Sequence, residues 1–209
     1  MRKPLEVAAA ICLLILSGCA TLSESQCVAS DWETVGYRDG LTGTASSQLL
    51  QHQNACIKHG IAPDRDSYLV GWQQGVEQYC QPDNGFSVGQ RGGGYSSICP
   101  SHLKDAYYAA YQDGRLLFTA QSEINRMNRQ ISQKEHRIKQ IKSEQSSAEA
   151  DLIADETETE QRLELLLTTK ALAEEHGTLE SEILDLKVQV AVKSEQLSEL
   201  RNDLAYVAY

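Results

Sequence analysis

The chain has 209 residues, of which 41% are hydrophobic and only 6% aromatic, and its formal net charge at pH 7 is −10. This length allows one small core plus an extended element. Because nucleic-acid binding needs a concentrated basic face, the acidic balance argues against nucleic acid as a partner.

The N-terminus has the pattern of an export signal. Arg2 and Lys3 form a positive start, and an apolar run of about ten residues follows from Val7 to Leu16. A membrane-spanning helix needs about twenty apolar residues. The run is therefore predicted to be a cleaved signal and not a membrane span.

Leu16-Ser17-Gly18-Cys19 resembles a bacterial lipobox. In such signals the thiol receives a diacylglyceryl group, cleavage exposes the cysteine, and its new N-terminus is acylated, for example with palmitate. The resemblance implies a lipoprotein signal peptide over residues 1–18, lipidation at Cys19, a tether over residues 19–26 and essentially permanent membrane anchoring. Ala20 resembles an outer-membrane sorting address, which implies the periplasmic face of the outer membrane. The alternative is an ordinary secretory cleavage nearby, with Cys19 incidental.

Four cysteines remain once Cys12 leaves with the signal and Cys19 is lipidated: Cys27, Cys56, Cys80 and Cys99. An even number in a short exported segment indicates two disulfides. Three connectivities are possible, and we favour Cys27 with Cys56 and Cys80 with Cys99 because each bond would join consecutive elements. A metal site built from His52, Cys56, His59, Cys99 and His102 is the competing interpretation, although none of the familiar zinc spacings is present.

Residues 20 to 118 are predicted to form short helices with little strand character. Ser46 and Ser47 are candidate caps, Gly60 ends that helix, and Asp64 or Asp66 begins the next. The run Pro82-Asp83-Asn84-Gly85 predicts a turn. Pro100 and Ser101 begin a further helix.

A degenerate repeat of an aromatic residue with small residues four apart runs through this region. It includes Gly36 to Gly40, Tyr68 to Gly75, Phe86 to Gly89 with Gly93, and Tyr108 to Gly114. Such spacing places the small residues on one helical face, where two backbones can approach closely. We interpret it as tight helix packing that arose by internal duplication.

The same region resembles an uncharacterised family of bacterial envelope lipoproteins, domain of unknown function 2799, over residues 27 to about 118. The resemblance rests on spaced glycines, cysteines and aromatics, among them Asp31-Trp32, Asp39-Gly40, His52, His59-Gly60, Tyr79-Cys80, Asn84-Gly85, Tyr95 and Cys99-Pro100. It implies a cell-envelope lipoprotein and brings no activity or catalytic residue with it. Trp32, Trp72 and the tyrosines could stack on a sugar ring or simply form the core.

From about Thr119 the composition is typical of a coiled coil, and Gly177 is its only glycine. One heptad register runs from Ile124 to Leu152. A second predicts an interface formed by Leu165, Leu172, Leu179, Ile183, Leu186, Val190, Leu197, Leu200 and Leu204. His176 and Lys193 are polar residues in this second seam.

The two registers are offset by three residues near Asp155 to Glu160, so a stammer or a turn must lie there. We favour one long or slightly broken helix, which would extend roughly 150 Å at 1.5 Å per residue, because the segment lacks a turn glycine or proline. A hairpin would instead place basic residues Arg126 to Lys142 beside acidic residues around Glu174 to Asp185.

The expected fold is therefore all-α: a disulfide-stapled helical domain over 27–118, then a coiled coil over 119–209 that is a long helix or a hairpin. We expect a membrane-anchored envelope lipoprotein without enzymatic activity, metal or cofactor. Its coiled coil would associate with another copy or with another envelope protein. The alternative function is a module that binds an envelope glycan or metal through residues 27–118.

Overall fold

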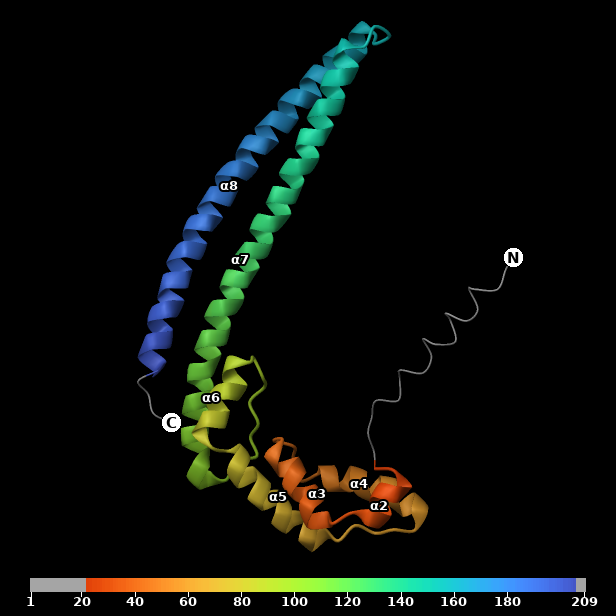
Figure 1. The fold of residues 1–209 in the computed structure, drawn as a ribbon, viewed down its shortest axis with the longest axis vertical. Helices are drawn as coiled ribbons and strands as arrows, with labels where there is room; N and C mark the ends of the chain where they lie inside the picture. Colours follow the sequence, from red (N-terminus) through yellow and green to blue (C-terminus); the bar gives the residue numbers. More distant parts are fainter. Residues whose placement is uncertain (1–21, 206–209) are drawn as a thin grey trace, which may run out of the picture. The chain divides into compact units, whose positions relative to one another are not determined.

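The computed structural model describes residues 22–205, and within this range the chain is all-helical and contains no strand (Figure 1). The signal peptide and Cys19 lie outside the described residues. The elements are α2 (Glu24–Ala29), α3 (Trp32–Leu41), α4 (Gln48–Cys56), η2 (Ile57–His59), α5 (Arg65–Tyr79), α6 (Pro82–Gln90), α7 (Ser101–Ile153) and α8 (Thr159–Ala205). Helix α2 begins inside the segment that the sequence assigned to the tether.

Local capping explains where several helices begin. The Asp31 carboxylate accepts from the amide of Glu33 at the start of α3, and the Asp64 carboxylate accepts from the amides of Asp66 and Ser67 at the start of α5. These contacts satisfy amides that have no partner inside the helix. Ser47 occupies the cap position of α4 but its side chain makes no capping hydrogen bond.

The turn predicted at Pro82 to Gly85 is wrong, because these residues form the first turn of α6. Proline is tolerated there, since the first amides of a helix have no intrahelical acceptor in any case. The Asn84 amide donates to the carbonyl oxygen of Tyr79 at 2.7 Å, which ties the start of α6 to the end of α5.

Glycines allow α3 and α5 to pack with their backbones in close approach. A Cβ added at Gly36 or Gly40 would overlap the carbonyl oxygen of Tyr68 or Trp72, respectively. The same holds in the other direction, where Gly71 and Gly75 of α5 face carbonyl oxygens of α3. Only residues without a side chain fit these positions.

Helices α6 and α7 cross in the same manner. Added Cβ atoms at Gly85 and Gly89 of α6 would meet the carbonyl oxygens of Tyr107 and Tyr111, and one at Gly114 of α7 would meet that of Phe86. The repeat therefore consists of two helix pairs, and not of four equivalent helices.

The two pairs also match in sequence and in their hydrogen bonds. The first helices share Gly-aromatic-x-x-Gly-x-x-Gly, at Gly36 to Gly43 and Gly85 to Gly92, and the second share Tyr-x-x-small-aromatic-Gln-x-Gly, at Tyr68 to Gly75 and Tyr107 to Gly114. At the equivalent aromatic positions, Trp72 Nε1 donates to the carbonyl oxygen of Thr44 (2.8 Å) and the Tyr111 hydroxyl donates to that of Gly93 (3.0 Å). This correspondence supports the predicted internal duplication.

Helices α7 and α8 form a hairpin, so the continuous helix that we favoured is wrong (Figure 1). Residues 154–158 connect the helices without glycine or proline. The Arg162 guanidinium instead donates to the carbonyl oxygens of Leu152, Ala154 and Thr157, and the Thr157 hydroxyl donates to that of Asp151. These side-chain hydrogen bonds add to the backbone bonds of Ala154 to Asp151 and of Thr157 to Ala154, and together they hold the connection between the two helices in place.

The described residues divide into two compact units, one of residues 22–85 and 94–110, the other of residues 86–93 and 111–205. We call the first the base domain, and the paired parts of α7 and α8 the hairpin. Helix α7 runs unbroken through residue 118, where the sequence placed a domain boundary. Within residues 22–205, none of the helices combines the length and apolarity needed to cross a bilayer.

Candidate functional site

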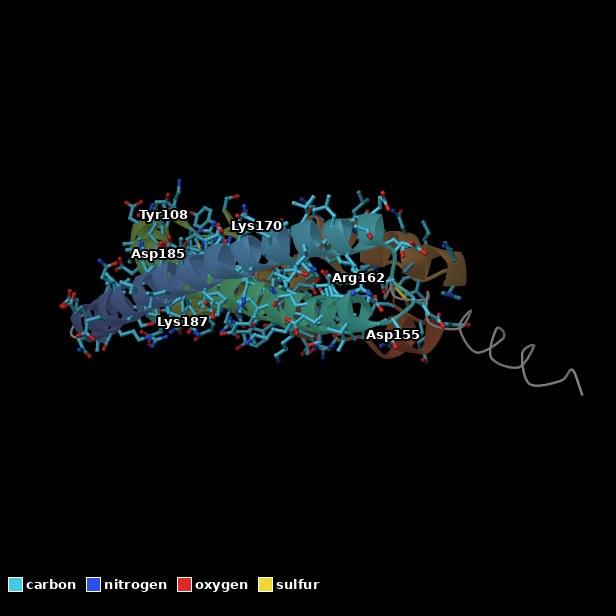
Figure 2. All side chains as sticks on the ribbon, turned by 90° about the horizontal axis from the view of Figure 1, so that it is seen from above. Tyr108, Asp155, Arg162, Lys170, Asp185 and Lys187 are labelled. Atoms are coloured by element: carbon cyan, nitrogen blue, oxygen red, sulfur yellow. A yellow bond between two sulfur atoms is a disulfide. The ribbon has the colours of Figure 1, made fainter. Side chains whose placement is uncertain are left out.

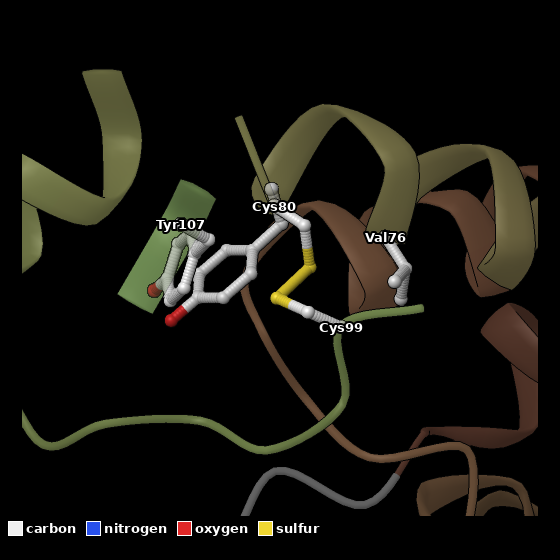
Figure 3. Close-up of a cluster of buried hydrophobic side chains, with 5 residues drawn as sticks. Val76, Cys80, Cys99 and Tyr107 are labelled. Carbon is white, nitrogen blue, oxygen red and sulfur yellow. A yellow bond between two sulfur atoms is a disulfide. The ribbon is translucent and has the colours of Figure 1, made fainter. Parts of the chain in front are cut away.

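Two disulfides hold the base domain together, and their connectivity is the one we favoured. Cys27 bonds Cys56, and Cys80 bonds Cys99 beside Val76 and Tyr107 (Figure 3). All four cysteines are buried in two hydrophobic clusters.

The metal site considered from the sequence is wrong, because the sulfurs of Cys56 and Cys99 belong to different disulfides. No cluster of three metal-binding side chains occurs within the described part of the chain. His59 and His102 instead lie near carboxylates, at 3.5 Å from Glu24 and 3.1 Å from Glu77.

A partly buried polar cluster joins α3, α4 and α5. The Asp39 carboxylate lies 2.8 Å from His52 Nε2 and accepts a 2.7 Å hydrogen bond from the Tyr68 hydroxyl. Burial and the adjacent Asp39 carboxylate raise the pKa of Tyr68, so the phenol stays neutral. The sequence drew attention to His52 only as a candidate metal ligand, whereas the structure assigns it a role in joining three helices.

The tryptophans belong to the base-domain core and not to an open stacking platform. Trp32 is 8% exposed, and Trp72 is half-buried with its indole N–H bonded to Thr44. Tyr68 and Tyr107 are fully buried. Their packing gives no support to glycan stacking by these side chains.

The structure places all nine predicted coiled-coil interface residues on the inner face of α8. Leu172, Ile183 and Leu197 are buried, and the other six are half-buried: Leu165, Leu179, Leu186, Val190, Leu200 and Leu204. On α7, the first register supplies the buried side chains Ile124, Met127, Ile131, Ile141 and Ala148. The two registers thus belong to two helices that face each other.

Ion pairs flank this apolar seam and match the charge pattern expected of a hairpin. Lys134 reaches Glu182 at 2.6 Å, and Arg137 binds both carboxylate oxygens of Glu175 at 2.8 Å. The two hydrogen bonds from Arg137 lower the pKa of Glu175. The predicted proximity of the basic and acidic segments is confirmed.

Further pairs extend along the same seam. Lys187 lies 3.0 Å from Glu135, and Lys193 lies 3.1 Å from Glu123. Lys193 therefore carries its charge out of the seam to a partner on α7. His176 lies 3.4 Å from Glu180, one turn away on its own helix.

Helix α8 also carries apolar side chains away from α7. Six of them are between 52% and 64% exposed: Leu163, Leu166, Leu167, Leu184, Val188 and Val192. We call five of these residues, all except Leu166, the outer stripe. The heptad register did not reveal this stripe because it accounts only for the inner seam, although the run Leu165-Leu166-Leu167 signals more apolar side chains than one seam can bury.

Comparison with known families bears out the resemblance noted from the sequence. Residues 31–116 match the family described as "Protein of unknown function (DUF2799)". This segment covers most of the base domain and the start of α7. No curated protein and no solved structure matches the chain.

Proposed function

We propose that this chain, whose residues 31–116 match a family of unknown function, is a non-enzymatic lipoprotein of the cell envelope. It acts by binding another protein chain through its helical hairpin. The observation that carries the proposal is the outer stripe of α8, because exposed apolar patches mark interaction surfaces.

The proposed anchor is a lipid on Cys19 in the motif Leu16-Ser17-Gly18-Cys19. Ala20 assigns the protein, by analogy with other lipoproteins, to the periplasmic face of the outer membrane. Two buried disulfides support an exported location, because such bonds persist in oxidising compartments. Four residues lie between Cys19 and Glu24, the start of α2. The five residue steps from Cys19 to Glu24 reach at most about 17 Å when fully extended, so α2 begins close to the bilayer.

The proposed interaction arm is long. Helix α8 has 47 residues, which corresponds to about 70 Å at the rise of an α-helix. Helix α7 packs against its inner face, whereas its outer stripe is exposed to solvent in the single chain. A helix of this length offers an extended surface to a partner chain.

Metabolic labelling tests the anchor. Cells producing the full chain are given an alkyne-tagged palmitate, and the labelled protein is followed through membrane fractionation. We expect Cys19→Ser to abolish both the label and membrane association. Cys12→Ser is the matched control and should change neither, because Cys12 lies within the signal. Retention of label by Cys19→Ser would contradict the anchor.

Site-specific photocrosslinking in intact cells tests the arm. A photoreactive residue at Leu184, in the outer stripe, should form a covalent adduct with a protein chain identified by mass spectrometry. The control position is Gln133, which is exposed on the polar outer face of α7. The interaction role is wrong if neither position yields a protein adduct.

A further inference from the structure

The outer stripe lies on a single face of α8. Leu163 and Leu184 are three heptads apart, as are Leu167 and Val188. In a helix that supercoils against a partner, residues separated by whole heptads point in the same direction. The stripe therefore consists of two apolar patches along one line, with residues 168–183 between them.

The two patches are arranged symmetrically about a point between Gly177 and Thr178. Turning a second α8 through 180° about this point places Leu163 opposite Val192 and Leu167 opposite Val188, since the residue numbers of each facing pair add to 355. At the centre, a Cβ added to Gly177 would have no atom within 4 Å. A second helix can therefore approach closely where the two helices cross.

Charges decide the direction in which two such helices pair. In the antiparallel register Lys170 faces Asp185 of the other copy, whereas a parallel register would oppose Lys170 to Lys170 and Asp185 to Asp185. Both lie along one side of α8 in Figure 2, while Lys187 lies toward α7. The Lys170 amine is 3.8 Å from Glu174 with both side chains mostly exposed, so this weak pair leaves Lys170 able to bind elsewhere.

Helix α7 offers a second copy no comparable surface. Between residues 119 and 152 its outward residues are mostly polar or charged, including Arg129, Gln133, His136 and Lys139. Its exposed large apolar side chains, Tyr108, Leu116 and Ile153, lie near its two ends and form no continuous stripe. An isologous dimer interface is formed by one surface that is complementary to itself under a two-fold rotation. The two patches and the pairing of Lys170 with Asp185 have this property, and the one like-charge contact on the same line is that of Glu160 with Glu195, beyond the two patches.

We infer that a second copy of this chain binds the outer stripe, so that two α8 helices pack antiparallel about Gly177 and Thr178. This inference rests on the proposed interaction role of the hairpin and names its partner. Leu167 and Val188 form the apolar contacts on either side of the centre, and Lys170 and Asp185 set the direction.

Disulfide crosslinking of the full-length chain in detergent tests the geometry. The variant carrying Leu167→Cys and Val188→Cys should oxidise to a covalent dimer, and peptide mapping should find residue 167 joined to residue 188. The matched control carries Arg129→Cys and Ala150→Cys, which are exposed on α7 and also three heptads apart. It should remain monomeric on denaturing gels. Crosslinks of 167 to 167 and 188 to 188 would overturn the antiparallel arrangement.

Sedimentation equilibrium tests the association itself. Leu167→Glu combined with Val188→Glu should weaken dimerisation by about a hundredfold or more, because each dimer would bury four charges in an apolar contact. Circular dichroism should be unchanged, since both side chains are exposed in the single chain. Lys170→Asp should weaken the dimer, and Lys170→Asp with Asp185→Lys should restore it. A monomeric wild-type chain, or a dimer indifferent to these variants, overturns the inference.

The crosslink from Leu184 separates this inference from the proposed function. An adduct with a second copy of the chain supports both. An adduct with a different protein alone overturns the dimer and leaves the interaction role intact. The absence of any protein adduct contradicts both.

Discussion

Arg162 donates a 2.7 Å hydrogen bond to the carbonyl oxygen of Ala154, and through it the first turn of α8 holds the connection that follows α7. Figure 2 labels Arg162 and Asp155 at this end of the hairpin. The same guanidinium reaches the carbonyl oxygens of Leu152 and Thr157. Arginine has five N–H donors in a planar group and can satisfy several carbonyls at once. A side chain from the following helix thus replaces the glycine or proline expected at such a turn.

Arg162→Ala should destabilise the hairpin by about 1–2 kcal/mol, because three carbonyl oxygens lose their hydrogen bond from the guanidinium but are near enough to solvent to bind water. Chemical denaturation followed by circular dichroism measures the change. Arg129→Ala, at an exposed position of α7, is the matched control and should lie within about 0.5 kcal/mol of wild type. Equal effects of the two substitutions would contradict the capping role.

Gly40→Ala should destabilise the base domain by about 3 kcal/mol or more, because its Cβ would overlap the carbonyl oxygen of Trp72 and force α3 and α5 apart. Gly94→Ala is the control, since its Cβ would have no atom within 4 Å. Thermal unfolding and the yield of folded protein report both effects. A Gly40→Ala protein as stable as wild type would refute the close packing of the two helices.

Replacing Cys80 and Cys99 together by serine should lower the free energy of unfolding by roughly 3 kcal/mol. The disulfide closes a loop between residues 19 apart, and a bond of this span stabilises the protein by about that amount because it restricts the unfolded chain. The bond lies in the core beside Tyr107, so the serine hydroxyls add a burial cost. Denaturant titration of the wild type with and without reductant provides the comparison. Adding reductant should lower the stability of the double variant only by the contribution of its remaining Cys27–Cys56 bond.

Acid should weaken the hairpin through Glu175. Hydrogen bonds from Arg137 hold the pKa of Glu175 below its ordinary value of 4.5. The folded state therefore gains stability above the unfolded pKa and loses it as pH falls through the lower folded value. Glu175→Gln should be less stable than wild type at neutral pH and equal to it in strong acid.

Unfolding titrations at several pH values measure this difference. Raising the salt concentration should reduce it, because both side chains are partly exposed and their charges are screened. Glu149→Gln, which removes an exposed carboxylate of α7, should show no such trend. A difference between wild type and Glu175→Gln that persists unchanged into strong acid would contradict the ion pair.

Local patterns were sufficient for the all-helical class and for the faces of the long helices. Residues such as Ile131 and Leu172 recur at heptad spacing, and that spacing alone determines which side of a helix can be buried. The carboxylate of Asp64 caps α5 from the adjacent position in the sequence, so its role could also be predicted from the sequence. The glycines at Gly36 and Gly40 signalled close backbone approach for the same reason.

Tertiary structure decided every feature that joins distant residues. It selected the hairpin through Arg162, paired Cys27 with Cys56, placed His52 against Asp39, and grouped the glycines into two helix pairs. It also revealed the outer stripe, because a residue such as Leu184 can be recognised as uncovered only once α7 is seen to occupy the opposite face. Periodicity tells which face of a helix is apolar, whereas the partner that covers it depends on contacts between residues far apart in the chain.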